Sequence, residues 1–204
     1  MGKFETQTHS QRFALGIICG LLPIGCLLFG LLGEYRGINY DGWYDSISAT
    51  YFANSNMCMI GALCLCSFFL FTYKGYDLGD RVYTLVAAVS APLIVAFPCA
   101  PAPTDYVGLF ACPIKVSNVI HIVAAAVLFG SFALMTLRQF TKGKHKRRNT
   151  IYRICGWTML ALMAIVGIGY ILDFLSYVTM ICEAGMLWAF AVAWIIKSGV
   201  FPQI

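Results

Sequence analysis

Residues 116–137 read VSNVIHIVAAAVLFGSFALMTL, and the chain continues as RQFTKGKHKRRNTIYR over residues 138–153. About 20 consecutive, mostly apolar residues are what an α-helix needs to cross the hydrocarbon core of a bilayer. The second stretch carries seven Lys and Arg residues, and basic loops are retained on the cytoplasmic side of a membrane. The two stretches together predict a spanning helix whose C-terminal end faces the cytoplasm.

Five further apolar runs have a similar character. They cover residues 13–32, 57–73, 82–98, 151–172 and 178–196. Because a backbone in lipid must satisfy its own hydrogen bonds, each run predicts a helix. We therefore expect an all-α fold, an integral membrane bundle of six transmembrane helices that forms a single domain over residues 1–204. Pro92 and Pro98 predict that the third helix is short and is kinked or frayed at its far end.

The composition supports lipid as the solvent of this chain. Hydrophobic residues make up 60% of it and charged residues 11%, against roughly 45–50% and about 25% in soluble domains. A globule of this size keeps a large wetted surface, so burial alone cannot absorb the excess. The net charge of +5 does not indicate a nucleic-acid partner, because no aromatic interleaving or nucleic-acid-binding motif accompanies it.

The distribution of basic residues predicts the orientation. Arg36 and Lys115 are expected in outer loops, which leaves 12 of the 14 Lys and Arg residues on one side. This asymmetry predicts a multi-pass protein of the cytoplasmic (inner) membrane with both the N-terminus and the C-terminus in the cytoplasm. We interpret the basic run 142–148 as part of this topology signal rather than as a site for anionic lipids or nucleic acid.

Polar and ionisable residues gather near the predicted outer ends of the helices. An ionisable residue in mid-membrane costs about 2.5–3.5 kcal/mol on insertion scales, so each one requires a partner. The candidate ligand-binding residues are His121, Asp173, Glu183, Asp45, Ser46, Ser48, Asn118 and Tyr170. Because they share one depth on separate helices, we expect His121, Asp173 and Glu183 to converge, with a Ser or Asp of segment 45–48 completing the cluster.

Such a cluster permits several chemistries. His121, Asp173 and Glu183 are suitable ligands for Zn²⁺ or a similar divalent ion. Alternatively, His121 and a carboxylate form an acid–base pair, with Ser46 or Ser48 as an activated nucleophile. A purely structural interpretation is also open, because Asp45, Ser46 and Ser48 are good caps for the second helix. The sequence leaves any cofactor, and catalysis itself, undetermined.

Cysteine and glycine positions add two expectations. Cys99 and Cys112 are the only two of the nine cysteines placed in an outer loop, where an oxidising compartment would allow them to form a disulfide. Gly16 and Gly20 form a G-x-x-x-G motif, and Gly185, Ala189 and Ala193 form a stripe of small residues. Such stripes allow close helix contacts, either within one subunit or in a homo-oligomer.

Several segments resemble known families. They are DSISATY at 45–51, TYKGYD at 72–77, His121, and RNTIYRICG at 148–156. Over nearly its full length the chain resembles an uncharacterised family of six-helix bacterial inner-membrane proteins, a domain of unknown function, which implies fold and location only. It is more weakly similar to intramembrane hydrolases related to alkaline ceramidases and progestin-type receptors. Those proteins use a Ser, an Asp and three His around zinc, whereas this chain has a single intramembrane His and no H-x-x-x-H.

The sequence thus predicts a multi-pass membrane protein with an outer-leaflet polar pocket that binds a small or lipid-like ligand. The first alternative is a membrane-embedded hydrolase, with or without a metal. The second is a structural or accessory subunit that docks a protein partner. Membrane lipids are the expected partners, and no nucleic acid is expected.

Overall fold

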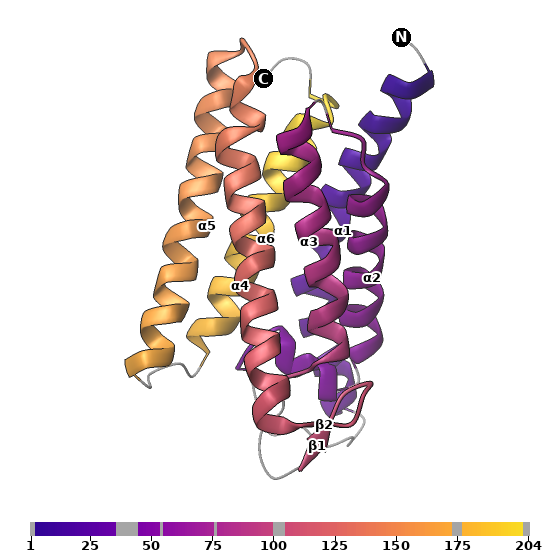
Figure 1. Cartoon of the computed structure of the whole chain (residues 1–204), viewed down its shortest axis with the longest axis vertical. Helices are drawn as coiled ribbons and strands as arrows, with labels where there is room; N and C mark the ends of the chain where they lie inside the picture. Colours follow the sequence, from indigo (N-terminus) through magenta and orange to yellow (C-terminus); the bar gives the residue numbers. More distant parts are fainter. Residues whose placement is uncertain are drawn as a thin grey trace.

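A computed structural model describes residues 3–35, 45–53, 55–75, 77–99, 105–172 and 177–201. Figure 1 shows helices running side by side along its length. The helices are α1 (Lys3–Tyr35), α2 (Asn56–Thr72), α3 (Leu78–Ala96), α4 (Ile114–Arg138), α5 (Lys146–Leu172) and α6 (Val178–Lys197). Two 3₁₀ turns, η1 (Ser48–Phe52) and η2 (Phe140–Lys142), and two short strands complete the described elements. The all-α fold class is confirmed.

Helices that follow one another in the sequence also lie next to one another in the bundle. Each helix packs against the next one along the chain, and α6 returns to pack on α1, so the bundle is closed. The start of α1 and the end of α6 lie at one end of the bundle, which we call the terminal end, and η1 lies at the opposite end (Figure 1). The strands β1 (Tyr106–Val107) and β2 (Cys112–Pro113) pair antiparallel at the η1 end. The sequence analysis did not predict this hairpin.

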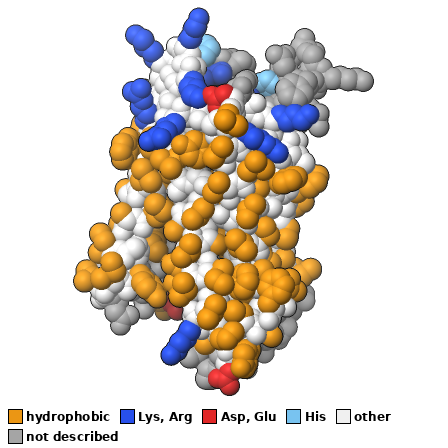
Figure 2. Space-filling view, in the orientation of Figure 1, with side chains coloured by type: hydrophobic (Ala, Val, Ile, Leu, Met, Phe, Trp, Pro, Cys, Tyr) orange, Lys and Arg blue, Asp and Glu red, His pale blue; other side chains and the backbone are white. Residues whose placement is uncertain are grey.

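The outer surface of the bundle is apolar around its middle. Figure 2 shows a broad band of hydrophobic side chains, with most Lys and Arg residues gathered at the terminal end. Large side chains such as Trp157 and Ile171 are 64% and 79% exposed, and soluble proteins rarely expose apolar area on this scale. Within the described residues five helices, all except α2, are long and apolar enough to cross a membrane. α2 is equally apolar but has 17 residues.

Local signals account for the limits of α3. The carboxylate of Asp77 accepts a hydrogen bond from the Asp80 N–H at 2.9 Å and caps the first turn. α3 ends at Ala96, because the residue before a proline avoids the helical region and Phe97 precedes Pro98. The predicted run 82–98 therefore began four residues late and ended two residues late. Pro92 lies within α3 and does not end it.

The G-x-x-x-G motif of α1 lies against α6. A Cβ atom added at Gly16 would approach Ile195 Cγ1 to 2.6 Å and the carbonyl oxygen of Ala191 to 3.1 Å. The two backbones therefore pack closely only because Gly16 has no side chain. This contact lies within one chain, as the first of the two interpretations of the motif predicted.

Candidate functional site

The site begins where α3 ends. Phe97 and Pro98 follow the last residue of α3, so their carbonyl groups have no helical partner, and a buried carbonyl needs one. Two side chains one turn apart on α4 bind them. His121 Nδ1 lies 2.9 Å from the Phe97 oxygen, and Ser117 Oγ donates to the Pro98 oxygen at 2.8 Å. The α3–α4 pair is thereby joined at the η1 end.

The second ring nitrogen of His121 binds η1. Its Nε2 lies 2.8 Å from Ser48 Oγ, and the imidazole is almost fully buried, with 4% of the residue exposed. The carbonyl of Phe97 can only accept, so Nδ1 must carry a proton. In the neutral imidazole Nε2 is then an acceptor, and the Ser48 hydroxyl donates to it. One histidine thus connects α3, α4 and η1.

Glu183 holds the same segment from the opposite side. Its Oε2 accepts a hydrogen bond from the Ile47 N–H at 2.6 Å. Nearby, the N–H of Met180 donates to the carbonyl oxygen of Asp45 at 3.0 Å. Segment 45–48 is therefore attached to α6 by backbone groups and to α4 through Ser48.

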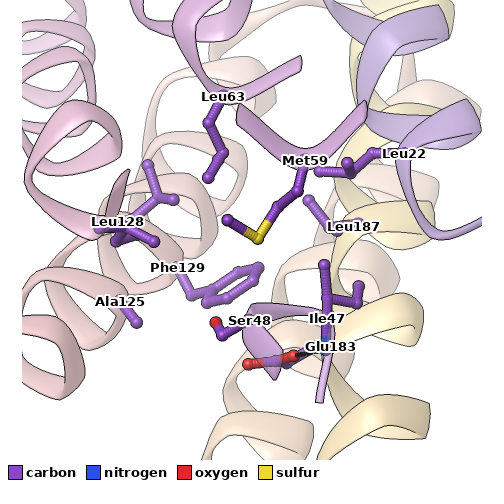
Figure 3. Close-up of a pocket in the computed structure, with 11 residues that line it drawn as sticks. Leu22, Ile47, Ser48, Met59, Leu63, Ala125, Leu128, Phe129, Glu183 and Leu187 are labelled. Carbon is purple, nitrogen blue, oxygen red and sulfur yellow. Dashed lines mark hydrogen bonds between the residues drawn. The ribbon is translucent and has the colours of Figure 1, made fainter. Parts of the chain in front are cut away.

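A small cavity opens between these groups. Of the 11 residues that line it, only Ser48 and Glu183 have polar side chains (Figure 3). Figure 3 shows both at one end of the cavity, with Leu63 and Met59 at the other. About 30 Å³ is open to a water-sized molecule, which is enough for one or two waters. The cavity is thus an apolar space with a polar end.

The structure brings three of the predicted residues to this place, namely His121, Ser48 and Glu183. His121 is hydrogen-bonded to Ser48 and to a backbone carbonyl, and its predicted convergence with Asp173 lies outside the described residues. Ser46 follows the structural interpretation, because its Oγ accepts from the Ala49 N–H at 3.0 Å and caps the turn that becomes η1.

Other predicted residues lie elsewhere. Asp45 contributes its backbone, while its side chain is exposed. Tyr170 is 66% exposed on the outside of α5, so the expectation that it belongs to the pocket is not met. Asn118 is half-buried on α4, one turn before His121. Asp173 lies outside the described residues, and so does any contact that it makes.

Neither a metal site nor a disulfide is formed in the described part of the chain. No group of three His, Cys, Asp or Glu residues is arranged there to hold an ion, so a metal site that includes Asp173 stays a prediction. Cys99 and Cys112 are free, half-buried thiols. Burial, together with the nearby Glu183 carboxylate, raises the pKa of the Cys99 thiol. Their oxidation to a disulfide also stays a prediction.

A second buried polar cluster at the terminal end was missed by the sequence analysis. Arg12, which is 2% exposed, donates to the Tyr73 hydroxyl and to the Lys197 carbonyl oxygen. Asp80 and Gln139 are also buried at this end. Arg12 is one of the 12 basic residues assigned to the cytoplasmic side by the sequence, and that assignment does not predict its burial. Its position directly before the apolar run 13–32 was the one clue to its burial. An arginine there is buried if it lies on the face of the helix that packs against the other helices.

Comparisons of the chain with known protein families, with curated proteins and with solved structures found no match. The interpretation of the site therefore rests on its geometry.

Proposed function

We propose that the chain is a multi-pass protein of the cytoplasmic membrane in which all six helices cross the bilayer and both termini face the cytoplasm. Two observations support this proposal. Large exposed apolar side chains occur on every helix and form a broad band on the face shown in Figure 2, where the basic residues gather at the terminal end, as expected of a cytoplasmic face. The 17 residues of α2 span only about 25 Å. Its short length is accommodated because η1 precedes it at the outer end and local thinning of the bilayer is inexpensive.

We further propose that the cavity beside Ser48 binds a lipid-like ligand in the outer leaflet. The observation that carries this proposal is the composition of the cavity lining, which is apolar except for Ser48 and Glu183. Ligand sites typically combine an apolar surface with a few well-placed polar groups. The apolar part of the ligand would pack against side chains such as Met59 and Leu128, while its polar group would bond the Ser48 hydroxyl or the Glu183 carboxyl.

The open space admits only a water-sized molecule in the present conformation. A ligand must therefore displace some of the lining. Met59 and Phe129 are the long side chains in that lining, and methionine is flexible enough to rearrange at modest cost. The ligand-bound protein is accordingly expected to differ from the present structure mainly in these side chains.

Neighbouring alanines on α4 provide a matched test. Ala125 lines the cavity, whereas Ala126 is exposed on the outer face of the same helix. Protein purified in a mild detergent would be extracted with organic solvent, and the retained lipids would be quantified by mass spectrometry. Ala125→Leu should reduce the retained lipid several-fold, because the added side chain fills the cavity, while Ala126→Leu should not. A wild-type protein without retained lipid, or equal retention in both variants, would contradict the proposal.

A membrane-embedded hydrolase is the second candidate function, and the bond between Ser48 and His121 is the observation that favours it. A role as an accessory subunit stays a prediction, which co-purification of a stoichiometric protein partner would test.

A further inference from the structure

We propose that Ser48 is a nucleophile and His121 its general base, and that together they hydrolyse a carboxylic ester of a lipid-like molecule. This inference rests on the proposed function, because the ester must reach Ser48 through the cavity described above. It goes further by assigning a reaction and a chemical role to each of the two residues.

The distances match those of an activated serine. A nucleophile and its base lie about 2.6–3.2 Å apart, and a third group orients the base. Ser48 Oγ and His121 Nε2 are 2.8 Å apart, and the carbonyl oxygen of Phe97 lies 2.9 Å from Nδ1. Phe97 therefore takes the orienting role that a carboxylate often has, because its carbonyl fixes the tautomer in which Nε2 accepts a proton.

Ser48 and His121 differ in their access to the cavity. The hydroxyl-bearing side chain of Ser48 lines the cavity (Figure 3), whereas His121 is buried and is not among the residues that line it. Once side chains such as Met59 and Phe129 move aside, a substrate in the cavity would meet the Ser48 hydroxyl before the imidazole.

Ser46 offers a contrast within the same segment. It lies two residues before Ser48, but its Oγ is bonded to the Ala49 N–H. His121 is hydrogen-bonded to Ser48 Oγ and to the Phe97 carbonyl oxygen. Of the two serines that the sequence analysis proposed as nucleophiles, the geometry therefore selects Ser48.

The reaction can be written with its protons accounted for. Ser48 Oγ adds to the ester carbonyl carbon while its proton passes to His121 Nε2. The C–O bond to the alcohol then breaks, and the alcohol leaves with the proton from Nε2, so that an acyl ester of Ser48 remains. Water, deprotonated by Nε2, attacks this acyl group. The carboxylic acid leaves, and the proton returns to Ser48 Oγ. Each step is acid–base catalysis by one imidazole.

The cavity also restricts the substrate. Among the described residues that line it, the only other polar side chain is the carboxyl group of Glu183, and none is basic, so an anionic group of the substrate would find no counter-charge in that lining. We therefore infer an ester without a carboxylate or phosphate next to the scissile bond. The acyl chain would lie along apolar residues such as Leu22, Met59 and Leu128.

A serine-reactive probe tests the assignment directly. The full-length protein in detergent micelles would be incubated with a long-chain alkyl fluorophosphonate, which bonds phosphorus to an activated serine oxygen and releases fluoride. Intact-mass measurement and peptide mapping should find one adduct, on Ser48. Ser48→Ala should abolish it, and Ser46→Ala should keep it. His121→Gln should slow labelling about 100-fold or more, the lower end of the contribution of a general base.

Folding is monitored in parallel by thermal unfolding of every variant. Should His121→Gln not fold, the comparison of Ser48→Ala with Ser46→Ala still decides, because each removes a single hydroxyl group. Absence of a Ser48 adduct in the folded wild-type protein, or an unchanged rate in folded His121→Gln, would overturn the inference. The lipid-retention measurement distinguishes failure of the hydrolase inference from failure of the proposed ligand site. Retained lipid without labelling overturns only the hydrolase, and loss of both overturns the proposed ligand site as well.

Discussion

The guanidinium group of Arg12 and the hydroxyl group of Tyr73 are joined by two hydrogen bonds at the terminal end of the bundle. Nε and Nη2 of Arg12 lie 3.1 Å and 2.9 Å from the phenolic oxygen. A third donor, Nη1, lies 3.4 Å from the carbonyl oxygen of Lys197. Because these groups belong to α1, to the segment after α2 and to the end of α6, Arg12 connects three parts of the fold at the proposed cytoplasmic face.

We expect Tyr73→Phe to destabilise the protein. The change removes the acceptor of two hydrogen bonds from a buried charged group, which typically costs about 1–3 kcal/mol or more. For a chain of this size each kcal/mol lowers the melting temperature by roughly 2–4 °C. Thermal unfolding in detergent measures the effect. Tyr83→Phe is the matched control, since Tyr83 is a half-buried tyrosine on α3. Equal melting temperatures for the two variants would show that the Arg12 contact is not stabilising.

A second prediction concerns the contact of α1 with α6. Gly16→Ala should destabilise the bundle, because the new methyl group would lie 2.6 Å from Ile195 Cγ1 and 3.1 Å from a backbone oxygen that cannot yield easily. Overpacking of this kind costs about 1–3 kcal/mol. Gly61→Ala on α2 serves as the control, since no described atom lies within 4 Å of its added Cβ. Chemical unfolding in detergent should separate the variants, and a neutral Gly16→Ala would contradict the close α1–α6 approach.

Much of this fold follows from the sequence because lipid imposes a simple rule. An apolar run of about 20 residues in a bilayer must form a helix, and each of the six predicted runs corresponds to one. The residues at which the helices begin and end were predicted less accurately. α3 begins at Leu78 and stops at Ala96 because of an Asp77 cap and of Pro98, which are local effects that a count of apolar residues does not detect.

The candidate site was predicted only in part. Depth along the helices placed His121, Ser48 and Glu183 in one layer, because an ionisable group in an apolar surrounding requires a partner. The hydrogen-bond partners of His121 and Glu183 did not follow from the sequence, because a shared depth indicates which side chains are near one another but not which backbone groups are. Backbone groups fill that role instead, namely the Phe97 carbonyl for His121 and the Ile47 N–H for Glu183. The Phe97 carbonyl is free to accept a hydrogen bond because α3 ends before Pro98, and the Ile47 N–H is free to donate one because the chain turns there into η1.

The ion pair between Asp77 and Lys142 predicts a pH dependence. The Lys142 ammonium group, helped by the Asp80 N–H, lowers the pKa of Asp77 below its usual value near 3.8. A carboxyl group whose pKa is lower in the folded state stabilises the fold above its unfolded pKa, and this contribution is lost as the pH falls through the folded value. The contribution of this ion pair to stability should therefore be constant near neutral pH and decline below about pH 4.

Asp77→Asn isolates this effect. The amide oxygen can still accept the Asp80 N–H that caps α3, but the charge is gone. The melting temperature of the variant should depend less on pH below about 4 than that of the wild type, with a small difference at neutral pH because both side chains are well exposed. Added salt should narrow that difference through screening. Identical pH profiles of variant and wild type would rule out the ion pair as the cause.

The last prediction tests the orientation on which the position of the cavity depends. The η2–α5 connection carries the basic residues of segment 142–148, and moving such a segment across the membrane is disfavoured. Lys144 lies there and is exposed, while Leu109 lies in the hairpin at the opposite end and is 75% exposed. In a background where Cys99 and Cys112 are replaced by Ser, Leu109→Cys should react with a membrane-impermeant maleimide in intact cells. Lys144→Cys should react only after permeabilisation. The reverse pattern would place the termini outside and move the cavity beside Ser48 to the inner leaflet, where its ligand would come from the cytoplasmic side.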